Sequence, residues 1–98
     1  MEKTGKQQQG DPFGVGASVF VRTVTHHYTG RIVSRNVDEL RLVDAAWIAD
    51  DGRFSTALET GVFSEIEPYP TACEPIAINR GSIVDMCVWP HPLPRTQK

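Results

Sequence analysis

The stretch INRGSIVDM, residues 78–86, offers the clearest ligand chemistry in the chain. Two apolar runs flank Asn79, Arg80 and Gly81. An arginine guanidinium is a planar fork that grips a phosphate or a carboxylate through two hydrogen bonds, whereas a lysine offers a point charge. The lysines all lie near the chain ends and the body carries only arginines, a distribution that biased codon usage would also produce. We therefore predict a structural hairpin, in which Gly81 takes a positive φ, that also serves as a ligand corner around Arg80.

Other groups that could do chemistry have simpler explanations. Adjacent His26 and His27 point to opposite faces of a strand, so they cannot chelate one metal without a bulge and are expected at a turn or rim. Carboxylate pairs fall in polar turns or on alternating strand faces, where solvation accounts for them. Nothing resembles a nucleophile with its base, a phosphate-cradling glycine loop or a zinc ligand set. We therefore expect a protein that is not an enzyme and that uses no metal or cofactor.

Length and composition narrow the possible functions. A chain of 98 residues forms one domain, and domains of this size often associate. The formal net charge of -2 disfavours a strongly basic, non-specific nucleic-acid binder. No apolar run reaches the roughly 20 residues of a spanning helix, and the first residues lack the apolar middle of a signal peptide. We expect a cytoplasmic protein with no membrane partner, whose two cysteines are reduced thiols.

Alternating apolar residues predict an all-β fold. The expected strands cover residues 15–25, 28–34, 40–49, 74–79 and 82–89. Gly30 within the second strand indicates strong bending or a close approach of another backbone. The apolar positions of the third strand are expected to share one face: Leu40, Leu42, Ala46 and Ile48. Five strands with short hairpins and one long interruption are typical of a small, strongly bent barrel or sandwich.

The chain divides into a polar N-terminal tail (1–12), a β-barrel domain (13–89) and a proline-rich C-terminal arm (90–98). Alternate prolines exclude a central strand from the arm, which is expected to pack across its own domain or a neighbour. Binding to an aromatic groove is the alternative for this arm.

A long loop at residues 49–73 interrupts the strand pattern. The Asp-Gly dipeptide at 51–52 is a hairpin signal, so the third strand is expected to turn back on itself there. A helical turn is predicted at residues 55–60. Thr56 and Glu59 have the spacing of a capping box, and Gly61 is expected to close the far end of this turn.

The order of these segments resembles the Sm-like family, which comprises Sm proteins and bacterial RNA chaperones, over residues 15–88. The segments YTGRIV and LRLVDA resemble the family's first motif at Gly30, Ile32, Leu40, Leu42, Asp44 and Ala45. The segment IAINRGSIV resembles its second motif at Ile78, Arg80, Gly81 and Val84. The resemblance implies a strongly bent five-stranded Sm-like (SH3-like) barrel with an elaborated loop between strands 3 and 4. It also implies a homo-oligomeric ring, formed by pairing of edge strands, with a pore where RNA bases stack.

The turn SRNVDEL departs from the family's RNA pocket. Asn36 stands where the family has an aspartate, and carboxylates at 38–39 occupy the base-stacking region, where they would repel phosphate. The residues that we predict to bind a ligand are Arg80, Gly81, Asn79, Asn36, Arg35 and Trp47. Trp47 would stack on a base, with core or interface anchoring as the alternative. A small, elaborated Sm-like chain of this kind is similar to those encoded by phages or mobile elements.

Two functional hypotheses follow from the sequence. The first is an oligomeric Sm-like ring that binds RNA or a small nucleotide at its subunit junctions, with Arg80 and Arg35 on phosphate. The second is a structural or scaffold protein that contacts a partner through the long loop and the proline arm, without binding nucleic acid. The acidic pI of about 5.8 favours the second hypothesis or a small-ligand version of the first.

Overall fold

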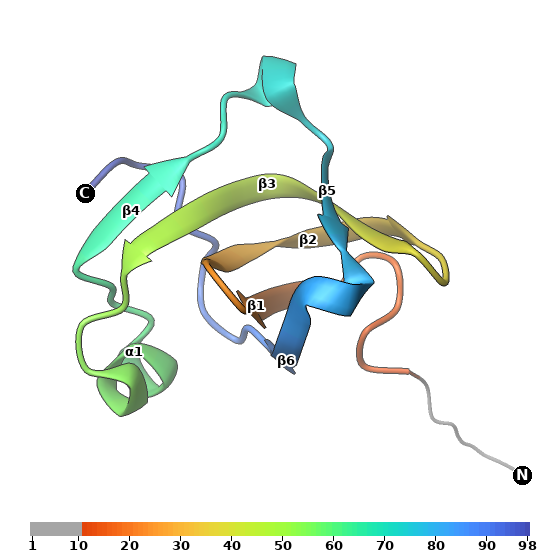
Figure 1. Ribbon diagram of the computed structural model, residues 1–98. Helices are drawn as coiled ribbons and strands as arrows, with labels where there is room; N and C mark the ends of the chain where they lie inside the picture. The colour runs from red at the N-terminus through yellow and green to blue at the C-terminus, as the bar shows by residue number, and fades with distance from the viewer. Residues whose placement is uncertain (1–10) are drawn as a thin grey trace, which may run out of the picture.

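The computed structural model describes residues 11–98, so the predicted N-terminal tail lies outside the described residues except for its last two. Strands dominate these residues (Figure 1), which confirms the predicted all-β class. In chain order the elements are β1 (Ser18–Thr23), β2 (His27–Arg35), β3 (Glu39–Asp50), α1 (Phe54–Thr60), β4 (Glu65–Pro68), η1 (Thr71–Cys73), β5 (Ile76–Asn79), η2 (Arg80–Ser82) and β6 (Ile83–Val88). The predicted count of five strands is wrong, because the long loop contains the additional strand β4.

All six strands of the described residues belong to one antiparallel sheet in the order β4-β3-β2-β1-β6, with β5 paired to β3. The length of β3 makes this possible, because β4 pairs with its C-terminal half and β5 pairs with its N-terminal half. Over residues 11–98, β6 pairs with β1, and no ladder joins β6 to β4 or β5. The sheet is therefore strongly bent but open.

The corner between β5 and β6 differs from the predicted hairpin. These two strands do not pair with each other in the described chain, since β5 pairs with β3 and β6 with β1. The corner is the 3-10 turn η2, in which the side chain of Asn79 accepts the backbone N–H of Gly81 at 2.7 Å. The predicted positive φ of Gly81 is also wrong, because the positive-φ glycines of the described residues lie elsewhere. A 3-10 turn uses ordinary right-handed backbone angles, so this position does not require glycine for its φ.

A β-bulge at Asp44 overturns the prediction that the apolar side chains of β3 share one face. Asp44 has φ 50°, and the register of β3 against β2 shifts beside it. Leu40 and Leu42 contribute to one apolar cluster, whereas Ala46 and Ile48 contribute to another. An extra residue in a strand reverses the faces of all residues that follow it, which explains the switch.

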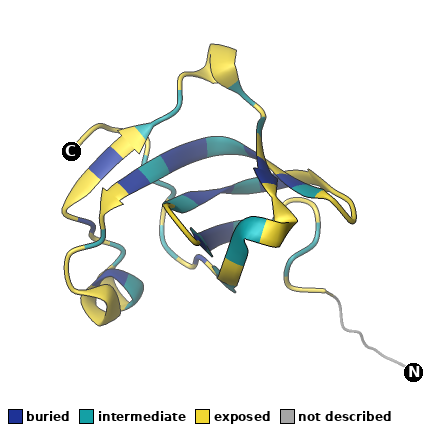
Figure 2. Ribbon diagram, viewed as in Figure 1, coloured by how far each residue is buried: buried dark blue, intermediate teal, exposed yellow. Residues whose placement is uncertain are grey.

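Two apolar clusters lie on opposite faces of the central strands, along which buried and intermediate residues are interspersed before the exposed strand ends (Figure 2). The buried members of the first cluster are Val19, Val21, Ile32, Leu40, Leu42, Ala45 and Ile78. The buried members of the second cluster are Phe20, Ala46, Ile48, Ala57, Phe63, Ile66 and Trp89. Successive residues of β1 are buried because Val19 and Val21 face the first cluster while Phe20 faces the second.

The long loop folds against the second cluster. Helix α1 buries Ala57 there, and it ends at Gly61, which has φ 76° and donates its N–H to the carbonyl of Ala57. The predicted helical turn and its closing glycine are confirmed. The predicted capping box is wrong, because Arg53 is the N-cap and makes no side-chain cap, while Thr56 lies inside the helix. The predicted reversal of the chain after β3 is present, since β4 pairs antiparallel with β3. The segment that connects these two strands contains α1, so it is longer than a tight hairpin turn.

The C-terminal arm packs along its own domain, as one of the sequence alternatives predicted. Immediately before the arm, the ring of Trp89 stacks on Phe63 with centroids 5.1 Å apart and an interplanar angle of 13°. Ile66 of β4 and Lys98 exchange two backbone hydrogen bonds of 2.9 and 3.0 Å. The guanidinium of Arg95 donates to the carbonyl of Ala45 at 3.1 Å. The arm thus covers the outer edge of β4, where Figure 1 shows it running beside this strand.

Cys73 and Cys87 are both free thiols. Burial raises the pKa of the Cys87 thiol, and the nearby charge of Asp85 adds to this effect. Within residues 11–98, no helix has the length and apolar character needed to cross a membrane.

Candidate binding site

The predicted ligand corner brings together residues from two turns. Glu39 at the start of β3 pairs with Asn79 at the end of β5, so the turn that contains Asn36 lies beside η2. The Arg80 guanidinium donates to the backbone carbonyl of Asn36, and the Arg80 N–H donates to the carbonyl of Asp38 at 2.9 Å. The predicted residues Asn36, Asn79, Arg80 and Gly81 therefore share one exposed corner.

The positive charges around this corner are largely neutralised. Arg35 forms an ion pair with Asp11, and Arg41 forms one with Glu39. The backbone N–H of Phe13, followed by Arg35, holds the pKa of Asp11 below its usual value. Arginines that are already paired with carboxylates have less affinity to offer a phosphate. The positive potential at the corner is therefore lower than the number of its arginines would indicate.

Trp47 lies away from this corner, near the end of β3. It stands directly opposite Tyr28 of β2, and the His26 ring meets it edge-on with centroids 5.2 Å apart. Trp47 borders a pocket of about 310 Å³, which we call the β2–β3 pocket. Its lining residues are Thr25, His26, His27, Trp47, Ile48, Ala49, Asp50, Asp51 and Gly52.

Backbone pairing positions the β2–β3 pocket. Antiparallel strands place the start of β2 beside the end of β3, and His27 is paired with Ile48. After β3 the chain turns at Gly52, which has φ 73° and donates its N–H to Oδ1 of Asp50 at 2.8 Å. A Cβ on Gly52 would lie 2.7 Å from Oγ of Ser64. Glycine is needed at this turn for both its φ and its size.

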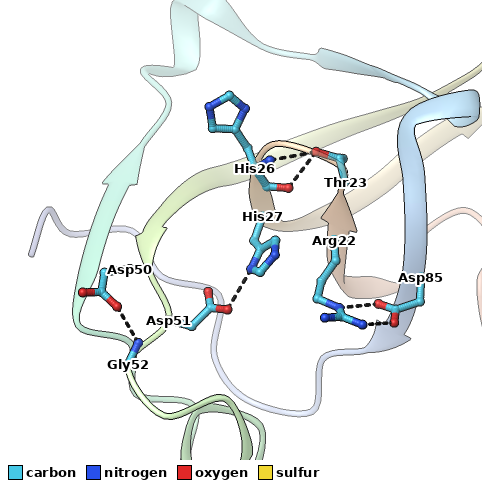
Figure 3. A network of polar contacts seen from close by, with 8 residues as sticks. All are labelled: Arg22, Thr23, His26, His27, Asp50, Asp51, Gly52 and Asp85. Carbon is cyan, nitrogen blue, oxygen red and sulfur yellow. Dashed lines mark hydrogen bonds and ion pairs between the residues drawn. The ribbon is translucent and has the colours of Figure 1, made fainter.

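A histidine and an aspartate meet in this pocket (Figure 3). Nδ1 of His27 lies 2.7 Å from Oδ2 of Asp51. An ionised carboxylate only accepts hydrogen bonds, so Nδ1 carries the hydrogen and donates it. The Asp51 side chain is 15% exposed. Its other oxygen, Oδ1, is buried and receives no hydrogen bond from the described residues. Only one oxygen of this carboxylate therefore has a hydrogen-bond donor.

An arginine lies next to this pair without lining the pocket. Arg22 is paired with His27 across β1 and β2, but its guanidinium is bonded to Asp85 of β6 (Figure 3). The central carbon of the Arg22 guanidinium, Cζ, lies 5.0 Å from the ring centroid of Phe54 in α1. The hydrogen bonds from Arg22 hold the pKa of the Asp85 carboxyl below its usual value. The charge of Arg22 is thus matched mainly by Asp85, and the nearby charge of Asp51 also helps to raise the pKa of Arg22.

The pocket can supply an aromatic surface and hydrogen-bond acceptors. Its threonine, Thr25, has its hydroxyl 2.9 Å from Nδ1 of His26, so this hydroxyl is bonded to a different histidine from the one that contacts Asp51. The described residues contain no group of three or more histidine, cysteine or acidic side chains placed to hold a metal ion. Trp47 and the His27–Asp51 pair lie on opposite faces of the β2–β3 ladder, so the aromatic surface and these acceptors border the pocket from different sides.

The sequence prediction included Trp47 but missed His27 and Asp51. Each was interpreted by itself, the histidine as a turn or rim residue and the aspartate as a solvated turn residue. The predicted pairing of the second and third strands contained the missing signal, because an antiparallel hairpin brings its open ends together. Residues 27 and 51 lie at these ends.

Comparisons with known proteins assign no family to this chain. No protein-family model matches the chain, and no curated protein or solved structure matches it either. The resemblance to Sm-like proteins stays a prediction from the sequence motifs.

Proposed function

We propose that this protein is a non-enzymatic binding module whose ligand occupies the β2–β3 pocket. One observation carries this proposal: a pocket of about 310 Å³ opens at the end of the β2–β3 ladder, with Trp47 on one face of the ladder and the His27–Asp51 pair on the other. Trp47 is partly exposed there, and an aromatic surface with a few polar groups is typical of small-ligand sites.

Binding is favoured over catalysis by the partners of the His27–Asp51 pair. Nucleophilic catalysis requires a hydroxyl or thiol within hydrogen-bond reach of the base. In the described residues the Thr25 hydroxyl is bonded to His26 and to no other ring, and neither cysteine lines this pocket. The pair is placed to fix the orientation of Asp51.

A panel of small probes tests this proposal by ¹H–¹⁵N NMR. The panel contains blocked tripeptides with a basic, acidic or neutral central residue and the four common nucleoside monophosphates. We expect at least one probe to shift the amide signals of residues 25–27 and 47–52. A panel that leaves all these signals unchanged at millimolar concentration would overturn the proposal.

A second candidate function is the oligomeric Sm-like ring with RNA or a nucleotide at the Arg80 corner. Two observations favour it. The predicted corner residues do lie together, and strand β6 leaves one edge without a strand partner within residues 11–98. Val84 and Val88 on this strand are 58% and 46% exposed. An uncovered apolar edge strand tends to pair with another chain.

Native mass measurement, with absorbance at 260 nm, tests the second candidate. A closed oligomer that co-purifies with nucleotide or RNA supports it, and a monomer at micromolar concentration contradicts it. Arg80→Ala should then leave the oligomer intact and weaken nucleotide binding in a salt-dependent way. The scaffold alternative is less favoured, because Arg95 and Lys98 commit the arm to its own domain.

A further inference from the structure

We propose that β6 pairs antiparallel with β6 of a second copy of this chain, which joins the two sheets across a two-fold axis. The edges of the sheet differ in how they are protected. β4 contains Glu65, Glu67 and Pro68, and the C-terminal arm covers it at Ile66. β6 contains no lysine or proline, and within residues 11–98 no ladder joins its outer side to another strand. Folded proteins normally block such an edge, so an open one indicates a partner strand.

The backbone of β6 presents bonding groups along this edge. Trp89 donates its N–H to the carbonyl of Ser18 at 2.8 Å, so its backbone groups face β1. Successive residues of a paired strand direct these groups to alternate sides, so those of Val88 and Met86 face away from β1. No described turn or loop forms a backbone hydrogen bond with either residue. Val84, at the register shift near the start of β6, has no partner in the ladder with β1.

The side chains along the same edge are apolar and partly uncovered. Val84 and Val88 are 58% and 46% exposed, and Met86 between them is half-buried. The charged residue of this strand, Asp85, is already paired with Arg22. A charged peptide would therefore gain little from the described surface of β6, whereas an apolar strand would bury both valines.

A second copy of β6 fits this edge better than the other strands of the described chain. β5 has four residues against six in β6, and the edge of β4 is covered. A two-fold axis at Met86 places Val84 of each copy opposite Val88 of the other. Asp85 then lies opposite Cys87 of the second copy, so like charges do not face each other. The contact is small, so the dimer should be weak and should form between micromolar and millimolar concentration.

Sedimentation and NMR of the full chain test the dimer without any substitution. We expect the mass to rise from monomer to dimer between micromolar and millimolar concentration and to stop there. The amide signals of Val84, Met86 and Val88 should shift over the same range, whereas those of β4 should not. A monomer throughout this range, or shifts confined to other strands, would overturn the proposal.

Two double variants test the antiparallel alignment. In Val84→Lys/Val88→Lys each lysine would face a lysine of the second copy, whereas in Val84→Lys/Val88→Glu each would face a glutamate. We expect the dimer of the lysine–glutamate variant to be at least about tenfold tighter than that of the lysine–lysine variant. Val37→Lys adds a charge at an 86% exposed position in the turn before β3 and should leave the dissociation constant unchanged. Melting curves show whether each variant remains folded, and the concentration series of the native chain decides if one does not.

The outcomes distinguish this dimer from the Sm-like ring. Equal dissociation constants for the two double variants would overturn the two-fold alignment. A closed oligomer larger than a dimer would also overturn it, because each β6 would then have to pair with a different strand. Binding at the β2–β3 pocket can succeed or fail independently, because no residue of β6 lines that pocket.

Discussion

Glu74 holds Asp44 in its left-handed conformation from 30 residues further along the chain. Its Oε1 accepts the backbone N–H of Asp44 at 3.1 Å, and its Oε2 accepts that of Ala45 at 2.7 Å. The side chain of Asp44 is paired with Arg31 of β2. One carboxylate thus satisfies two backbone donors that the bulge removes from the strand ladder. Because this bulge sets the face of every later residue in β3, it also sets the orientation of Trp47 at the pocket.

Removal of this carboxylate should destabilise the fold. Glu74→Ala leaves two partly buried N–H groups without their acceptor, and a lost hydrogen bond of this kind costs about 1–3 kcal/mol. Glu74→Gln keeps one acceptor oxygen and should lose less. Urea denaturation measures both effects, with Glu65→Ala on the exposed side of β4 as the control. A Glu74→Ala protein as stable as the control would show that other contacts hold the bulge.

The bulge marks the limit of what the sequence could predict about the sheet. The even positions of β3 are apolar at 40, 42, 46 and 48, and the aspartate at 44 is a single polar position that does not by itself indicate a change of face. The change depends on Glu74, which lies in a different segment, and on a left-handed aspartate that no motif specifies. The all-β class, the second strand and the helical turn before Gly61 were predictable, because local alternation and turn residues determine them.

Gly30→Ala should destabilise the protein through steric crowding. An added Cβ would lie 3.0 Å from both Cβ and Cδ1 of Leu42 and 3.3 Å from the carbonyl oxygen of Val43. Gly30 and Leu42 are buried, so neither can move into solvent. Extra volume in a packed core costs about 1–3 kcal/mol. The prediction that Gly30 marks a close backbone approach is confirmed by these distances, and thermal or urea denaturation measures the cost.

Gly81→Ala is the matched control for this substitution. Gly81 is exposed, has no positive φ, and an added Cβ would approach only the Asn79 side chain, at 3.1 Å. We expect a change in the free energy of unfolding within about 0.5 kcal/mol, as for most surface substitutions. A loss at Gly81 as large as that at Gly30 would contradict this interpretation of the corner.

Local sequence motifs made only part of the candidate site predictable. The corner residues around Arg80 could be grouped because they follow recognisable turn and strand motifs. The β2–β3 pocket required the pairing of His27 with the end of β3 and the turn at Gly52, which together bring Asp51 to the histidine. Single-residue interpretation of a histidine or an aspartate cannot reveal such a pair, because its chemistry arises from the tertiary contact.

The Arg22–Asp85 pair should make stability depend on acid pH. Hydrogen bonds from Arg22 lower the pKa of Asp85 in the folded state relative to the unfolded chain. The stabilisation is therefore present at neutral pH and is lost as the pH falls through the folded-state pKa. Asp85→Asn should lower the melting temperature slightly at pH 7, because both side chains are partly exposed. The difference from the native chain should shrink as the pH falls below 4, the ordinary pKa range of aspartate.

Trp89→Ala should be the most destabilising substitution in the C-terminal region. The Trp89 side chain is 2% exposed, stacks on Phe63 and lies 5.6 Å from the Phe20 ring by centroids. Truncation of a buried tryptophan costs about 3–5 kcal/mol through lost burial and the cavity left behind. Trp47→Ala, at a half-buried position, should cost less stability while removing the aromatic wall of the pocket. Urea denaturation distinguishes them, and equal losses at the two positions would show that Trp89 does not anchor the second cluster.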